Sequence, residues 1–358
     1  MNHPLLSICM PTRNRAHWLK ATLPLWVEEV KEFGEECELI VSDNASTDDT
    51  QLFVKSLQES SFIKYSRNPQ DIGSNPNFFK AVSELATGTF AWVVGDDDAP
   101  TKGSVARVLG AIKENPNLRF FYANYVVWPA EGAPSGLVDT CRWVKEGNPN
   151  SLDVVDRRLN TLREVVGSDS SCFCSIYSLI MKRENLMEAF CPSLSAPHFS
   201  TAESVISHAL YVVKNYMDDP AYYLGRPCII ASPDCHWPEF APILHLHIVQ
   251  ELYDAVEQHG ISRDKVDAMR KEKLPVSARL LHDIVFVRNT PYRKHFSLGH
   301  YWSKHWRYRE FYPMLLKTGF LTFYYFSPRP VGRFMKRFWR TLRPVVHSDT
   351  ISDPLKDR

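Results

Sequence analysis

Several features of secreted and membrane proteins are missing from this sequence. No window approaches the roughly 18 to 20 consecutive apolar residues that a membrane-spanning helix needs, so we expect no transmembrane segment. Residues 1–6 lack the charged region and the apolar stretch of a secretory signal. The formal net charge of +1 gives the chain no general attraction to polyanions. We therefore expect a cytoplasmic protein.

Cysteines are scattered, with eight in 358 residues. Only Cys172 and Cys174 lie close together, and one C-x-C pair fits neither a zinc site nor a redox motif. Unpaired and mostly buried thiols in a reducing compartment are the expected state.

Two familiar nucleotide-binding loops are also missing. No G-x-G-x-x-G follows the first predicted strand, which disfavours a dinucleotide oxidoreductase. No glycine-rich, lysine-bearing phosphate loop occurs early in the chain, although a nucleotidyltransferase would normally show one. A Mg-dependent nucleotidyltransferase stays an alternative because such enzymes also use acidic clusters. A non-catalytic binding or scaffold protein is the other alternative.

The first half of the chain alternates strand and helix patterns, and its composition of 44% hydrophobic and 23% charged residues is typical of a folded protein. Strands are predicted at Leu5–Met10, Glu38–Val41, Phe62–Tyr65 and Thr89–Val94. Helices are predicted at Ala16–Phe33, Asp48–Gln58, Asn77–Leu85 and Gly103–Lys113. This alternation predicts an α/β fold with a mostly parallel central sheet.

The middle of the chain is less regular. Its apolar spacing predicts helices at Ser151–Val166 and Ala202–Lys214, and strands at Phe173–Met181 and Cys228–Ala231. From about residue 246 the pattern becomes helical. We therefore predict one α/β domain over residues 1–245 and a helical C-terminal region over residues 246–358.

Polar clusters follow three of the predicted strands. They are Thr12-Arg13-Asn14-Arg15, Asp43-Asn44 and Asp96-Asp97-Asp98. In parallel sheets, ligands bind beyond the carboxyl ends of the strands, where the connecting loops gather. We expect the three clusters to face one crevice.

Three consecutive carboxylates at a strand end repel one another unless a positive charge lies among them. A divalent cation relieves that repulsion, and hard oxygen ligands suit Mg²⁺ or Mn²⁺. Such an ion can bridge a diphosphate and neutralise the leaving group. The alternative is an acidic turn that caps the next helix.

The segments Ser7–Arg15, Val41–Asp48 and Gly95–Asp98 together resemble the three signatures of family-2 glycosyltransferases with the GT-A fold. Asn68 and Asp71–Asn75 also resemble a family segment. The resemblance implies a nucleotide-sugar-binding half over residues 1–130 and an acceptor-binding half over residues 131–245. It is closest to bacterial enzymes of O-antigen or capsule synthesis, of the abequosyltransferase type.

The resemblance implies a donor-binding set made of Pro11, Thr12, Arg13, Arg15, Asp43, Asn44, Asn75 and Asp96. Within this set, Asp43 would accept a hydrogen bond from a pyrimidine N3–H, and Asp96 would lie nearer the ribose. Asp97, Asp98 and His236 would hold Mn²⁺ or Mg²⁺, although a lone histidine such as His236 is more often structural. Gly95 occupies the first Asp position of the family's D-x-D-D pattern.

The resemblance also implies inversion at the anomeric carbon by a single displacement, which needs a carboxylate base. Glu203 lies at the family's usual distance from the acidic motif, and Thr201 could cap the helix that begins there. Asp169 and Asp234 are the alternatives, and an ordinary first-turn glutamate would be the structural explanation of Glu203. The implied donor is a UDP- or dTDP-sugar, and the implied acceptor is a glycan or lipid-linked glycan.

The segment 286–343 combines 13 basic residues with a single acid, Glu310, and interleaves them with aromatic residues. Basic groups attract anionic headgroups, and amphipathic rings suit a membrane interface. We expect this segment to lie on the inner face of the plasma membrane. A solvated basic face is the alternative. A nucleic-acid partner is not expected because no nucleic-acid-binding module accompanies the segment.

Overall fold

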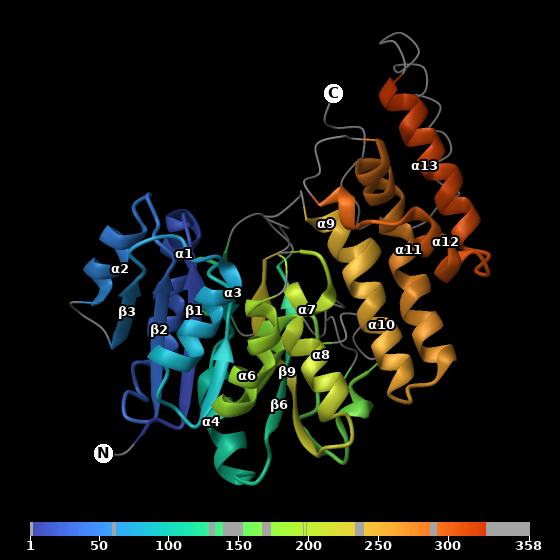
Figure 1. The fold of residues 1–358 in the computed structure, drawn as a ribbon. Helices are drawn as coiled ribbons and strands as arrows, with labels where there is room; N and C mark the ends of the chain where they lie inside the picture. The colour runs from blue at the N-terminus through green and yellow to red at the C-terminus, as the bar shows by residue number, and fades with distance from the viewer. Residues whose placement is uncertain are drawn as a thin grey trace. The chain divides into compact units, whose positions relative to one another are not determined.

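The computed structural model describes residues 3–58, 62–128, 133–138, 153–166, 173–195, 197, 199–232, 240–286 and 292–326. The chain forms two compact units. The first consists of Met1–His198 and Ala202–Cys235, and the second of Phe199–Thr201 and His236–Arg358. Figure 1 shows the sheet in the first unit and the helices of the second.

The N-terminal part of the first unit is a parallel sheet. Its strands are β1 (Leu6–Thr12), β2 (Cys37–Asp43), β3 (Ile63–Arg67) and β4 (Phe90–Val93), in the order β3-β2-β1-β4. The connecting helices include α1 (Ala16–Val30), α2 (Thr50–Gln58) and α3 (Ser74–Lys80), the last continuing as a π-helical turn, Ala81–Leu85. Strands β2 and β4 are buried along their whole length, as expected for a sheet covered on both faces.

The sheet continues through strands of mixed direction. Strand β8 (Leu179–Lys182) runs antiparallel between β4 and β6 (Phe120–Val127), and β9 (Ala221–Ala231) runs parallel to β6. Strands β5 (Ala99–Pro100) and β7 (Arg157–Leu159) pair antiparallel with β9. Helix α4 (Ser104–Glu114) follows β5. The predicted α/β fold is confirmed.

One predicted helix in this unit is wrong. In the described part of Ser151–Val166, residues 157–159 form β7, and Leu162–Glu164 form a short 3-10 helix. The apolar spacing fits a helix, but the edge of β9 offers this segment backbone hydrogen bonds. Glu164 and Thr161 then form a capping box that starts the 3-10 turn.

Aromatic contacts fix the core behind the acidic motif. Trp26 of α1 meets Trp92 of β4 edge to face, with ring centroids 5.4 Å apart. Phe90 and Phe121 make the same kind of contact at 5.5 Å. All four rings are buried, so helix α1 and strands β4 and β6 share one packed core.

Short helices complete the first unit. They are a 3-10 turn (Ile176–Ser178), α6 (Arg183–Phe190), a second 3-10 turn (Cys191–Leu194), α7 (Ala202–Val205) and α8 (Ser207–Asn215). The predicted strand Phe173–Met181 is therefore realised only from residue 179, as β8.

The second unit is helical, as predicted for the C-terminal region. It contains α9 (Ala241–Ile243), a π-helical turn (Leu244–Ile248), α10 (Val249–Gln258), α11 (Arg263–Phe286), a 3-10 turn (Arg293–His295), α12 (Leu298–His305) and α13 (Phe311–Phe326). In the part of the chain that the structure describes, no helix combines the length and apolarity needed to cross a bilayer.

Ion pairs, one of them formed by a buried arginine, join the helices of the second unit. Arg270 is only 2% exposed and lies 2.5 Å from a carboxylate oxygen of Asp254. Lys304 pairs with the other oxygen of Asp254 at 2.7 Å, and Arg307 pairs with Asp267 at 2.7 Å. Two cations of the predicted basic surface are therefore neutralised within their own unit.

Candidate functional site

The acidic motif is a tight turn that follows β4 and is held from behind by α1. Thr22 Oγ1 donates to the carbonyl of Asp96 at 2.7 Å, and Trp26 Nε1 donates to the carbonyl of Asp98 at 2.9 Å. The Gly95 amide donates to Asp98 Oδ2 at 3.0 Å. A Cβ atom at Gly95 would lie 2.5 Å from Asp98 Oδ2 and 2.7 Å from Asp97 Oδ1. Glycine at position 95 therefore makes room for the carboxylates.

Arg15 and Thr12 reach this turn from the end of β1. The Arg15 guanidinium spans two carboxylates, with Nε 3.0 Å from Asp96 Oδ1 and Nη2 2.7 Å from Asp97 Oδ2. Thr12 Oγ1 donates to the other Asp96 oxygen at 2.7 Å. Arg15 Nε is buried and has no well-aligned hydrogen-bond acceptor among the described residues. Its 3.0 Å contact with Asp96 is therefore an ion pair without a well-aligned hydrogen bond.

Burial and repulsion between neighbouring carboxylates oppose the ionisation of Asp96 and Asp98. Burial raises the pKa of Asp96 to about 7, even though Arg15 opposes that change. Burial and the charge of Asp97 raise the pKa of Asp98 well above its usual range. A cation among these groups would favour their ionised forms.

The carboxylate oxygens of Asp97 and Asp98 suit Mg²⁺ or Mn²⁺, so their chemistry fits the predicted ion. Among the described residues, no three His, Cys, Asp or Glu side chains form a ready-made metal site. The Ser232 amide, just beyond β9, hydrogen-bonds to Asp98. His236 and Asp234 follow Ser232 in the chain but lie outside the described residues.

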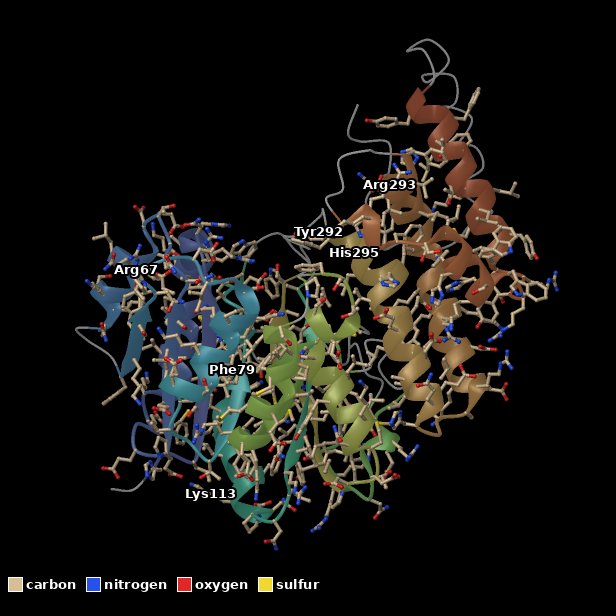
Figure 2. The ribbon with its side chains drawn as sticks, in the orientation of Figure 1. Arg67, Phe79, Lys113, Tyr292, Arg293 and His295 are labelled. Atoms are coloured by element: carbon tan, nitrogen blue, oxygen red, sulfur yellow. The ribbon has the colours of Figure 1, made fainter. Side chains whose placement is uncertain are left out.

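Asp43 ends β2 beside the end of β1, where its Cα is paired with that of Thr12. Its side chain is fully buried. Asp43 Oδ1 accepts from the Ser46 amide at 2.8 Å, and Oδ2 accepts from the Tyr65 hydroxyl at 2.6 Å. Arg67, visible on β3 in Figure 2, places its Nε 3.6 Å from Oδ2. These contacts hold the carboxylate in one orientation.

Asn44 connects the end of β2 to the loop before α3. Its Nδ2 donates to Asp71 Oδ1 at 2.6 Å, and its Oδ1 accepts from Asn68 Nδ2 at 3.1 Å. Lys80 donates to Asn68 at 2.7 Å, and Arg13 pairs with Asp71 at 2.5 Å. A polar network therefore orders this loop.

The first turn of α3 also reaches the helix that carries Glu203. Asn75 Nδ2 donates to the carbonyl of Ser204 at 2.6 Å. The side chain of Glu203 is 48% exposed, and one of its oxygens lies 3.4 Å from Lys214 Nζ. Glu203 is therefore accessible, while Ser204 behind it is buried.

The three predicted strand-end clusters do meet in the first unit. Asn44 N donates to Thr12 O at 2.9 Å, and Thr12 contacts Asp96. Pro11, one residue earlier on β1, pairs with Ser42 of β2. The alternative base Asp169, like Asp234, lies outside the described residues.

Sequence reasoning missed several residues that shape this region. Thr22 and Trp26 are four residues apart on α1, a spacing that indicates core packing and gives no sign of their bonds to the acidic turn. Tyr65 and Arg67 are two residues apart on β3 and therefore lie on the same face of the sheet. Pairing β3 with β2 would have placed both beside Asp43.

Residues 7–147 match the sequence model of the family described as glycosyl transferase family 2. Over this range, which is less than half of the chain, the chain resembles family-2 glycosyltransferases. The matched range contains Thr12, Arg15, Asp43, Asn44 and the acidic turn, so the cluster described above lies within the match.

Two curated relatives support the same assignment. The chain is 38% identical over 104 residues to abequosyltransferase RfbV of Salmonella typhimurium, which covers 28% of this chain and 31% of the relative. It is 34% identical over 114 residues to GalNAc(5)-diNAcBac-PP-undecaprenol beta-1,3-glucosyltransferase of Campylobacter jejuni, which covers 31% and 35% of the two chains. The chain thus matches only about a third of the length of these relatives.

A solved structure extends the fold comparison beyond the family-2 domain. S. aureus TarS 1-349, in complex with UDP-GlcNAc, superposes with a TM-score of 0.51 at 16% sequence identity. The match covers 95% of this chain and 85% of that one. At this identity the likeness concerns the fold, which is the GT-A fold expected from the sequence.

Proposed function

We propose that this protein is an inverting, metal-dependent glycosyltransferase that moves a sugar from a nucleotide diphosphate onto a hydroxyl group. The observation that carries the proposal is the acidic turn after β4, bridged by Arg15 and lying beside the ends of β1 and β2. A family-2 domain provides its context.

Asp97 and Asp98, with His236, would hold Mn²⁺ or Mg²⁺. When bound, the divalent ion would neutralise the negative charge of the departing nucleotide diphosphate. Arg15 would exchange part of its contact with Asp97 for a phosphate oxygen, because its guanidinium presents several donors in one plane.

Asp43 would read the base of a UDP- or dTDP-sugar. Its carboxylate is already held by Tyr65 and Ser46, so binding a pyrimidine N3–H would require no reorientation. Asp96 would lie nearer the ribose, with Thr12 orienting it. Pro11, Arg13 and Asn44 would shape the remaining nucleotide contacts. Asn75, which the resemblance also places there, donates its side-chain amide to the Ser204 carbonyl and would position α7 instead.

Glu203 would act as the base. Its carboxylate is accessible and would take the proton from the acceptor hydroxyl as that oxygen attacks the anomeric carbon. Asp169 and Asp234 are the alternatives.

The acceptor would be a glycan or a lipid-linked glycan of a bacterial surface polysaccharide. The activities of the relatives support this class, since one is an abequosyltransferase and the other is named for an undecaprenol-linked acceptor. We further propose that the protein works at the inner face of the plasma membrane, held there by the segment 286–343.

Nucleotide release from a panel of UDP- and dTDP-sugars, measured with Mn²⁺ and with EDTA, tests the proposal. We expect one donor to be consumed only with the metal, and Asp97→Ala to abolish that consumption. Asp49→Ala is the matched control because Asp49 is 71% exposed and makes only a 3.4 Å pair with Lys20. Full turnover in Asp97→Ala or in EDTA would reject metal dependence, and binding of a nucleotide sugar without turnover would favour the scaffold alternative.

A further inference from the structure

An apolar groove runs between three helices of the second unit. It encloses about 520 Å³ and is lined by Val285 and Phe286 of α11, Leu298 and Trp302 of α12, and Gly319 and Phe323 of α13. This volume is within the usual range for small-ligand sites.

The groove offers almost no hydrogen-bonding groups to an occupant. The hydroxyl-bearing side chains in its lining are Thr318 and Thr322. Thr318 Oγ1 donates to the carbonyl of Met314 at 3.0 Å, and Thr322 Oγ1 donates to the carbonyl of Thr318 at 2.9 Å. A polar occupant would lose its own hydrogen bonds to water without replacement, so an apolar chain is the favoured occupant.

An exposed apolar stripe continues from the groove along α13. Tyr312, Leu316 and Phe323 are 47%, 77% and 62% exposed. With Gly319 they recur at intervals of four, three and four residues, so they share one face of the helix. Exposed apolar side chains that gather on one helix face favour an interaction site there.

Cations lie close to the groove. Arg293 and Lys294 are exposed and precede Leu298 by five and four residues, so Lys294 lies within roughly 14 Å of it along the chain. Unlike Lys304 and Arg307, neither has an ion-pair partner among the described residues. Figure 2 labels Arg293 on the turn before α12. An occupant with an anionic head would complement this edge.

We propose that this groove binds an acyl chain of an anionic bilayer phospholipid, with Arg293 and Lys294 meeting its headgroup. A second copy of the chain fits less well, because it would bring the same cations together at the edge of the groove. The proposal rests on the membrane-surface part of the proposed function and adds a specific lipid site to it.

Photocrosslinking to the full-length protein tests this site. Vesicles of phosphatidylethanolamine and phosphatidylglycerol would carry a diazirine on the acyl chain of the phosphatidylglycerol, and mass spectrometry would locate the labelled peptides. We expect labels on α11, α12 and α13 at the residues that line the groove.

Gly319→Leu blocks the groove. A Cβ at Gly319 meets no atom within 4 Å, so the new side chain enters the groove without distorting the helix. Labelling should fall about tenfold, the loss expected when roughly two methylene groups are excluded. Gly110→Leu is the matched control, since a Cβ there also meets nothing within 4 Å and α4 belongs to the other unit. Circular dichroism and thermal unfolding would establish that both variants fold.

The headgroup contact is tested by replacing Arg293 and Lys294 with glutamine and repeating vesicle flotation. Binding to phosphatidylglycerol vesicles should fall severalfold, and binding to phosphatidylcholine vesicles should not change. Unchanged labelling in Gly319→Leu, labels outside α11–α13, or a dimer in solution that protects the groove would each overturn the proposal. No nucleotide sugar is present in these assays, so their failure leaves the glycosyl-transfer proposal intact.

Discussion

The side-chain amide of Asn75 donates a 2.6 Å hydrogen bond to the carbonyl oxygen of Ser204, the residue that follows Glu203. The bond crosses 129 positions of the sequence and joins α3 to α7. The first turn of α3 thereby holds the short helix that carries Glu203, the proposed base.

Replacing Asn75 with alanine should therefore slow the chemical step. We expect kcat to fall about tenfold, as for the loss of one positioning hydrogen bond, with the nucleotide Kd nearly unchanged. Steady-state kinetics and calorimetric nucleotide binding would measure the two effects. Asn115→Ala is a control, since its side chain bonds only within α4 and its cap. A weaker nucleotide Kd at constant kcat would instead place Asn75 against the nucleotide.

Glu203→Gln should remove the base and keep the shape of the side chain. We expect kcat to fall by about 10²- to 10⁴-fold while donor binding persists. Lys214→Met should cost little activity, because a half-exposed ion pair contributes at most about 1 kcal/mol. Full activity in Glu203→Gln would transfer the role to Asp169 or Asp234.

Gly95→Ala should disturb the acidic turn. The added Cβ would lie 2.5 Å from one oxygen of Asp98, so the carboxylates must move. We expect Mn²⁺-dependent turnover to fall at least about tenfold, given how steeply catalysis depends on position. Gly110→Ala should instead stabilise the protein by about 0.5 to 1 kcal/mol, because that helical position is open. Equal turnover in both variants would contradict the prediction.

His208 should make the first unit sensitive to acid. Burial lowers its pKa from 6.5 to about 4 in the folded state, where its Nε2 donates to the Cys174 carbonyl at 3.2 Å. As the pH falls below 6.5, His208 becomes protonated in the unfolded chain before it does so in the folded protein. The stability that depends on neutral His208 is therefore complete above pH 6.5 and declines toward pH 4. The loss should reach up to about 3 kcal/mol.

Thermal unfolding between pH 7 and pH 4 would measure this dependence. His208→Gln, which cannot ionise, should flatten it, while the exposed His17→Gln should not. A profile for His208→Gln as steep as that of the wild type would show that another group carries the acid sensitivity.

The meeting of the three strand-end polar clusters could be predicted because it follows from strand order. Each of Thr12, Asp43 and Asp96 comes at or just after the end of a buried apolar run. Parallel pairing of β1 with β2 and β4 brings these ends to one edge of the sheet. The direction of β8 could not be predicted, because the apolar run Leu179–Lys182 fits either strand direction and its neighbours lie far away in sequence.

The sequence alone also does not show which basic residues are paired with acids. Lys304 and Arg307 belong to a basic segment, yet their partners Asp254 and Asp267 lie 50 and 40 residues upstream. The roles of Thr22 and Trp26 were hidden for the same reason, since their acceptors are backbone carbonyls about 70 residues away.

Helix α1 holds the acidic turn through two uncharged side chains that donate hydrogen bonds to the backbone carbonyls of the turn. Neither of these hydrogen bonds involves the carboxylates of the turn. An ion or a nucleotide would then exchange at the carboxylates while the backbone of the turn keeps its position. Empty and loaded forms would share one scaffold, and each catalytic cycle would begin without refolding the loop.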